Sequence, residues 1–165
     1  IMKYIFRSFF LILIVILVSN CSDENNNNNN NFKTLKYNNS NMRVGPGKEF
    51  EIKWNFKKIG LPVKILNQYE RWYQVETPDG SIGWMNTRLF ERNKEKNKTV
   101  IFLKNSKILK KPNKNASIIG NIGKNNIVNI KSCKKEWCKI ESKKYNLIGY
   151  THKINIWGAI VSEPQ

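Results

Sequence analysis

The sequence has few of the residues that catalytic and metal sites need. It contains one histidine, three cysteines and 12 acidic residues among 165. Nucleophilic catalysis needs an activated serine or cysteine with a base in reach, and a zinc site needs four ligands at suitable spacing. We expect His152 at a strand end on the surface, and we find no pair of carboxylates placed for glycoside cleavage. The sequence therefore predicts no catalytic residue, no metal and no cofactor.

Arginine is also scarce. The basic residues are 24 lysines and 5 arginines, and the net charge is +17. Such a surplus suggests nucleic acid, anionic lipid or another polyanion as a partner, although abundant Lys, Asn and Ile with little Arg is also what an AT-rich genome imposes on any protein. The charge is spread along the chain and forms no basic helix or arm that could read a nucleic-acid groove. No nucleic-acid partner is expected.

One long apolar run lies near the beginning of the sequence. Phe9 to Val18 are ten consecutive apolar residues, preceded by Lys3 and Arg7. The run is shorter than the roughly 20 residues of a membrane span and fits the apolar region of a signal peptide after a positively charged start. We predict a signal segment over residues 1–20 and export of the rest.

The end of this segment, Leu17 to Cys21, resembles the lipobox of bacterial lipoproteins, although Asn20 stands where Gly, Ala or Ser is usual. The resemblance implies a lipid on Cys21 and a membrane-anchored protein of the periplasm or cell envelope. Cleavage to a free protein and retention as an uncleaved anchor are the alternatives. Seven asparagines, Asn25 to Asn31, follow, and we predict a disordered polar tether over residues 21–38.

An internal repeat occupies most of the remaining chain. Four pairs keep nearly one spacing: Trp72 with Trp137 and Val75 with Ile140 lie 65 residues apart, and Gly83 with Gly149 and Trp84 with Tyr150 lie 66 apart. Both copies read as short strands separated by Gly, Pro, Asn and Asp, with no helical periodicity. Residues 77–80 (Thr-Pro-Asp-Gly) are a strong turn signal for a hairpin. We predict an all-β fold of two small bent barrels, residues 39–91 and 98–158, and a tail over 159–165.

Two motifs in the first copy carry a family resemblance. Residues 41–47 read N-M-R-V-G-P-G and residues 79–84 read D-G-S-I-G-W. They resemble the opening and closing strands of the bacterial SH3-like (SH3b) domain. The second copy, with its C-x-x-x-W-C segment, is similar to a paired SH3-like family of exported bacterial proteins. Because residues 111–113 (K-P-N) replace G-P-G there, we expect a ligand site in the first copy.

The resemblance implies a non-enzymatic binding module of the bacterial cell envelope that recognises peptidoglycan stem peptides or a partner protein. A scaffold subunit without its own ligand and an accessory protein derived from a degenerate cell-wall hydrolase are the alternatives. SH3-like folds bind extended peptides between aromatic side chains. The candidate ligand contacts are Arg43, Trp54, Tyr69, Trp72, Tyr73 and Trp84. Core or edge packing is the alternative role of the aromatic residues, and an ion pair or solvation that of the arginine.

Two further cysteines, Cys133 and Cys138, flank a four-residue connection between two expected strands. Cβ atoms on neighbouring strands can approach within disulfide range, and an exported protein allows the bond to persist. We predict a disulfide, with two buried thiols or a metal site as the alternatives.

Overall fold

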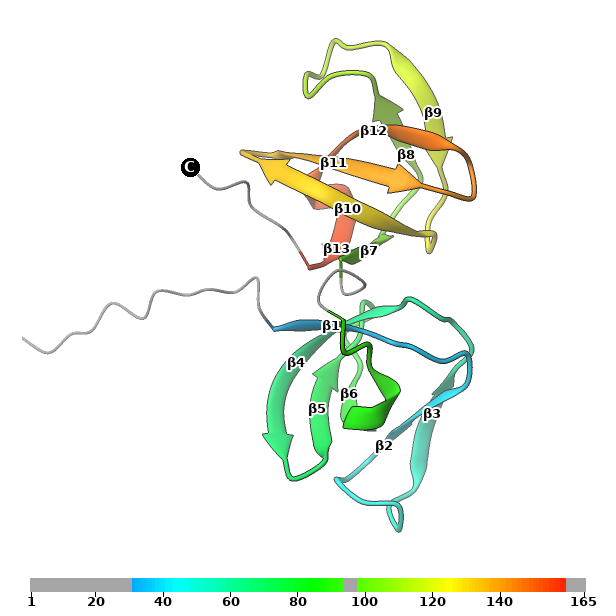
Figure 1. The fold of residues 1–165 in the computed structure, drawn as a ribbon, viewed down its shortest axis with the longest axis vertical. Helices are drawn as coiled ribbons and strands as arrows, with labels where there is room; N and C mark the ends of the chain where they lie inside the picture. The colour runs from blue at the N-terminus through cyan, green and yellow to red at the C-terminus, as the bar shows by residue number, and fades with distance from the viewer. Residues whose placement is uncertain (1–30, 94–97, 160–165) are drawn as a thin grey trace, which may run out of the picture.

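The structure is a computed structural model that describes residues 31–93 and 98–159. These residues form two antiparallel β-sheets, the lower and upper halves of Figure 1, with no helix longer than a three-residue 3-10 turn. The all-β prediction is confirmed. The predicted signal segment and Cys21 lie outside the described residues. Across the two described ranges, no helix has the length and apolar character needed to span a membrane.

The first sheet has six strands in the order β1-β4-β5-β6-β2-β3. Its elements are β1 (Phe32–Thr34), β2 (Ser40–Arg43), β3 (Ile52–Phe56), β4 (Pro62–Tyr69), β5 (Trp72–Glu76), β6 (Ile82–Asn86) and the 3-10 turn η2 (Thr87–Leu89). Strand β4 carries an extra residue between Ile65 and Asn67 in its pairing with β5. Such bulges bend a strand and increase its twist.

The second sheet has seven strands in the order β13-β7-β10-β11-β12-β8-β9. Its elements are β7 (Thr99–Phe102), β8 (Ser106–Leu109), β9 (Ile118–Ile122), β10 (Ile127–Lys134), β11 (Trp137–Ser142), β12 (Leu147–His152), the 3-10 turn η4 (Lys153–Asn155) and β13 (Ile156–Gly158). Strands β7 to β12 take the same order as β1 to β6, and β10 is bulged between Ile130 and Ser132, 65 residues after the bulge of β4. The repeat in the sequence is therefore also a repeat of strand order.

The tether prediction is wrong for its last residues. Phe32–Thr34 pair with β4, and Leu35 is completely buried. The reason is that the asparagine tract is followed by apolar side chains, which gain free energy by leaving water. The first sheet therefore begins seven residues before the predicted boundary at residue 39.

Strand β7 lies between two hydrophobic cores. All four of its residues are buried. Val100 and Phe102 belong to the core of the second sheet, whereas Ile101 belongs to that of the first. Because successive side chains of a strand point to opposite faces, this one strand contributes to both cores, and the two sheets pack directly on each other.

The predicted turn after β5 is present and is held by Asp79. Its Oδ1 accepts hydrogen bonds from the hydroxyl of Thr77 and, at 3.3 Å, from the backbone N–H of Ser81. The Gly80 N–H closes the turn on the Thr77 carbonyl at 2.9 Å, and Gly80 has a φ of 82° that suits glycine. The hydrogen bond from Thr77 is the main cause that holds the pKa of Asp79 below its ordinary value.

A pH-dependent contribution to stability follows from this turn. Because the pKa of Asp79 is lowered by folding, its ionised form stabilises the native state above the ordinary value of 3.8, and this contribution is lost as the pH falls below that value. We expect the free energy of unfolding of the wild type to fall towards that of Asp79→Asn when urea unfolding is measured from about pH 7 down to about pH 3. A constant difference between the two proteins across this range would contradict the assignment.

Candidate functional site

The outer face of the first sheet carries most of the predicted contact residues. Val75 and Met85 are completely buried on the inner face of β5 and β6. Alternation then places Trp72 and Trp84 on the outer face. In the strand register, Trp72 is opposite Tyr69 and Asn86, and Trp84 is opposite Gln74 and Arg43. Arg43, Tyr69, Trp72 and Trp84, four of the six candidates, therefore share one face.

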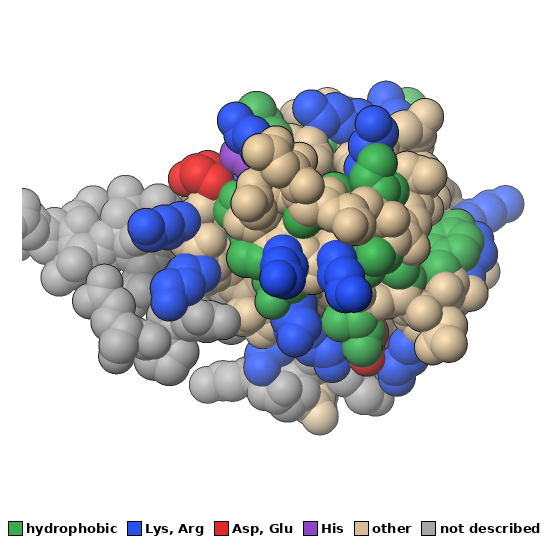
Figure 2. Space-filling view, turned by 90° about the horizontal axis from the view of Figure 1, so that it is seen from above, with side chains coloured by type: hydrophobic (Ala, Val, Ile, Leu, Met, Phe, Trp, Pro, Cys, Tyr) green, Lys and Arg blue, Asp and Glu red, His purple; other side chains and the backbone are tan. Residues whose placement is uncertain are grey.

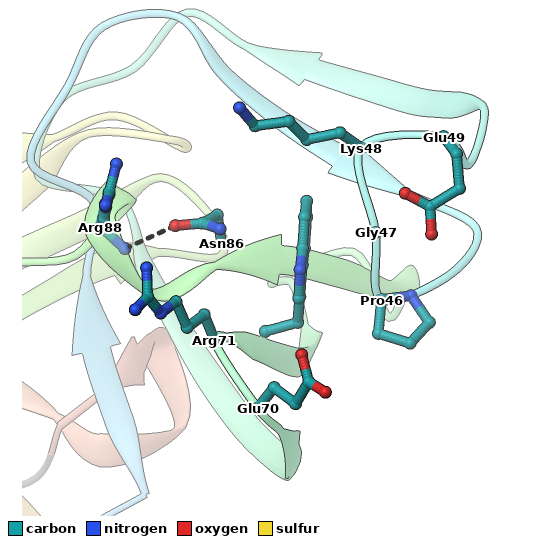
Figure 3. A pocket seen from close by; sticks show the side chains of 9 residues that line it. Pro46, Gly47, Lys48, Glu49, Glu70, Arg71, Asn86 and Arg88 are labelled. Carbon is teal, nitrogen blue, oxygen red and sulfur yellow. Dashed lines mark hydrogen bonds between the residues drawn. The ribbon is translucent and has the colours of Figure 1, made fainter.

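A groove of about 430 Å³ lies at one end of this face (Figure 3). Three segments surround it: the loop after β2, the tip of the β4–β5 hairpin, and the end of β6 with η2. It is lined by Pro46, Gly47, Lys48, Glu49, Glu70, Arg71, Trp72, Asn86 and Arg88. Its volume falls within the range of small-ligand sites, about 300–1,000 Å³. Among the six predicted contacts, Trp72 is the one that lines it.

The loop between β2 and β3 is held in shape by its own side chains. Arg43 Nη1 donates a hydrogen bond to the Phe50 carbonyl at 2.6 Å. The ring of Phe50 covers Gly45, where an added Cβ would lie 2.4 Å from the ring. The glycine at position 45 is therefore needed for this close approach, and the arginine of the N-x-R-x-G-P-G motif braces the loop that forms one wall of the groove.

Charges of both signs surround the groove. In the view of Figure 3 the guanidinium groups of Arg71 and Arg88 lie on one side, and the carboxylates of Glu49 and Glu70 lie on the other. Within the part of the chain that the structure describes, these four side chains form no ion pair with one another. The Asn86 side chain accepts a hydrogen bond from the Arg88 N–H at 3.1 Å and so fixes the start of η2. The charges of the groove are thus complementary to a ligand that carries both an anionic and a cationic group.

The other predicted aromatic contacts do not line the groove. Tyr73 packs edge to face against Phe90, with ring centroids 5.6 Å apart, on the core side of the sheet. Trp54 is 53% exposed on the edge strand β3, opposite Met42. Tyr69 is 55% exposed at the end of β4, beside the hairpin tip. The structure therefore does not bring Tyr73 and Trp54 to the groove.

The charged residues that line the groove are not predicted from the sequence. Glu70 and Arg71 form the two-residue turn between β4 and β5, and Glu70 has a positive φ of 46°. Their position between two strand signals was the available clue. Lys48 and Glu49 carry no such pattern, because they follow the Gly-Pro-Gly turn in an irregular loop.

The predicted disulfide is present in the second sheet. Cys133 in β10 and Cys138 in β11 are directly opposite each other, with Cα atoms 4.1 Å apart and an S–S bond between them. Both cysteines are buried in the core of that sheet. The bond joins the two strands just behind the hairpin tip.

The described residues form a small all-β module, and its groove has the volume of a small-ligand pocket. Residues 36–90 match the family model described as the bacterial SH3 domain. The resemblance predicted from the motifs is thereby confirmed for the first copy. A comparison with curated proteins found no match.

Two solved structures from Trichomonas vaginalis, NlpC2 and NlpC1, are similar to the chain at 15% and 14% sequence identity, with TM-scores of 0.34 and 0.35. The matches cover 77% and 76% of this chain. They cover 47% and 45% of those proteins, so the chain spans about half of their length.

Proposed function

We propose that the protein is a non-catalytic binding module of the bacterial cell envelope and that its first groove holds a peptidoglycan stem peptide. The groove at Trp72 carries this proposal, because it combines an aromatic side chain with three cations and two carboxylates that are not paired with one another among the described residues. Stem peptides carry carboxylates and, on their diamino acid, an amine. Complementary charges of both signs would select such a ligand and orient it.

The proposed architecture is a tandem of two SH3-like barrels behind an exported, lipid-anchored N-terminus. The match to the bacterial SH3 domain over residues 36–90 supports the first barrel, and the repeated strand order and bulge support the second. The disulfide supports an oxidising compartment, in which such bonds persist. Acylation of Cys21 would then hold both modules close to the membrane.

Sedimentation with intact cell-wall sacculi tests the binding function. We expect the protein without residues 1–20 to pellet with sacculi at low salt and at about 0.5 M salt, where screening removes purely electrostatic adhesion. Trp72→Ala should weaken binding about tenfold or more, the effect of removing a central aromatic contact.

Trp54→Ala is the matched control, because Trp54 is an exposed tryptophan of the same sheet that does not line the groove. It should bind sacculi like the wild type, and circular dichroism should show that both variants are folded. Equal losses in the two variants would overturn the assignment of the groove. Zymography of the same protein tests the non-catalytic part of the proposal, and clearing of a peptidoglycan gel would overturn it.

A further inference from the structure

The outer face of the second sheet has a hollow of its own, of about 460 Å³. It is lined by Pro112, Ser132, Lys134, Lys135, Trp137, Lys139 and Tyr150. Trp137 is the repeat partner of Trp72, and Lys135 takes the place of Glu70 at the hairpin tip. The two hollows are thus built on corresponding parts of the repeat but differ in charge.

The lining of the second hollow includes three lysines and no carboxylate. Residues 98–159 contain fourteen lysines, no arginine and two glutamates. Glu141 is paired with Lys131 at 2.7 Å, and this pairing lowers its pKa. Glu136 is part of the exposed turn and does not line the hollow. In the view from above, basic side chains surround apolar patches and few acidic side chains are seen (Figure 2).

Aromatic side chains give the hollow an apolar part. Trp137 and Tyr150 come from the neighbouring strands β11 and β12, and Tyr150 is opposite Lys139 in the register. Trp137 also lines an adjacent hollow of about 380 Å³ that includes Lys107 and Lys114. Lysines and aromatic faces side by side suit a ligand that has both an anionic group and a flat apolar or sugar surface.

The disulfide lies beside this site and favours a location outside the cytosol. Ser132 and Lys134 flank Cys133 in β10, and Trp137 and Lys139 flank Cys138 in β11, so four of the lining residues are direct neighbours of the disulfide. Their side chains are on the outer face while the sulfur atoms are in the core. Disulfides persist outside the reducing cytosol, and the proposed function is one of the cell envelope. On that basis an envelope saccharide is favoured over a nucleic acid as the anionic ligand of this site.

We propose that this hollow is a second ligand site, specific for an anionic saccharide. A phosphate or carboxylate of the ligand pairs with Lys134, Lys135 and Lys139, and a sugar ring lies against Trp137 and Tyr150. The same chemistry is offered by a soluble phosphosugar and by the headgroup of a phosphorylated glycolipid. The site is independent of the stem-peptide groove, because the two share no lining residue.

Titration with N-acetylglucosamine 1-phosphate, followed by tryptophan fluorescence or calorimetry, tests the proposal. We expect it to bind more tightly than either N-acetylglucosamine or inorganic phosphate. The double variant Lys134→Gln/Lys135→Gln should weaken binding about fivefold or more, because both exposed ammonium groups contact the anion. Lys104→Gln/Lys124→Gln removes the same charge from exposed positions outside the hollow and should change the affinity less than about twofold.

Three outcomes would overturn the proposal. One is an equal loss in both double variants, which would mean general attraction by net charge. Another is phosphosugar binding no tighter than phosphate binding. The third is tighter binding of a single-stranded DNA oligonucleotide that is also lost in the Lys134/Lys135 variant. Trp72→Ala should keep phosphosugar binding, so failure of the first groove and failure of this site can be told apart. Binding to vesicles that contain a phosphorylated glycolipid, compared with binding to the free phosphosugar, shows whether the anionic sugar comes from a lipid headgroup or from a soluble molecule.

Discussion

Replacing Gly83 by alanine is expected to destabilise the protein by about 2–3 kcal/mol, the upper part of the range for overpacking a filled site. A Cβ at this position would lie 2.6 Å from Met42 Cγ and 2.9 Å from the carbonyl oxygen of Arg43. The methionine can adjust its rotamer. The carbonyl belongs to the backbone of β2, which pairs with β6 at this point, so the two strands would have to separate.

Gly123→Ala is the matched control for this prediction. The nearest atom to an added Cβ there is Nδ2 of Asn126 at 3.3 Å, and both atoms within 4 Å belong to side chains and not to the backbone. We expect this variant to stay within about 0.5 kcal/mol of the wild type in urea unfolding. A Gly83→Ala protein as stable as Gly123→Ala would refute the close-approach explanation.

The corresponding glycine of the second sheet meets the same obstacle. A Cβ on Gly149 would lie 2.9 Å from the carbonyl oxygen of Leu109 and 2.5 Å from Ile108 Cγ2. The repeated Gly-Trp and Gly-Tyr pairs therefore have a packing cause. Strand β2 lies close to the glycine of β6, and β8 lies close to the glycine of β12. The glycine of each pair is therefore explained by strand packing and needs no ligand to explain it.

The strands were predictable because their signals are local. The expected strands at Trp72 and Trp137, the turn at residues 77–80 and the 65-residue spacing are all present in the structure. The packing of the two sheets was not predictable, because it depends on Ile101 entering a core distant in sequence. A run of four buried residues such as β7 has no periodicity that tells which core each side chain joins.

The groove was predictable in part. Trp72 could be found because it recurs in the repeat as Trp137, and both line hollows. Tyr73 was misplaced because an aromatic residue next to Trp72 must take the opposite face of the strand. Arg71 and Arg88 were not predicted, because a two-residue turn and a 3-10 turn at the ends of different strands bring them to the same side of the groove.

Replacing Trp157 by alanine is expected to destabilise both sheets, although the residue lies in β13 of the second. Trp157 packs against the core of the first sheet, and its ring meets Phe32 edge to face with centroids 4.9 Å apart. A buried hydrogen bond of 2.9 Å between the hydroxyls of Thr34 in β1 and Thr99 in β7 also joins the two sheets. Because Trp157 is only partly buried, we expect a loss of about 2–3 kcal/mol, below the usual cost of removing a core aromatic.

Hydrogen exchange shows which strands lose stability in Trp157→Ala. In Trp157→Ala the amides of β4 and β5 should lose protection together with those of β10 and β11, since a shared core makes the two sheets open cooperatively. Trp54→Ala removes an exposed tryptophan and should leave the protection of both sheets within about 0.5 kcal/mol of the wild type. If the change in Trp157→Ala stayed within the second sheet, the sheets would be independent units, and the packing of Ile101 and Trp157 would contribute no coupling between them.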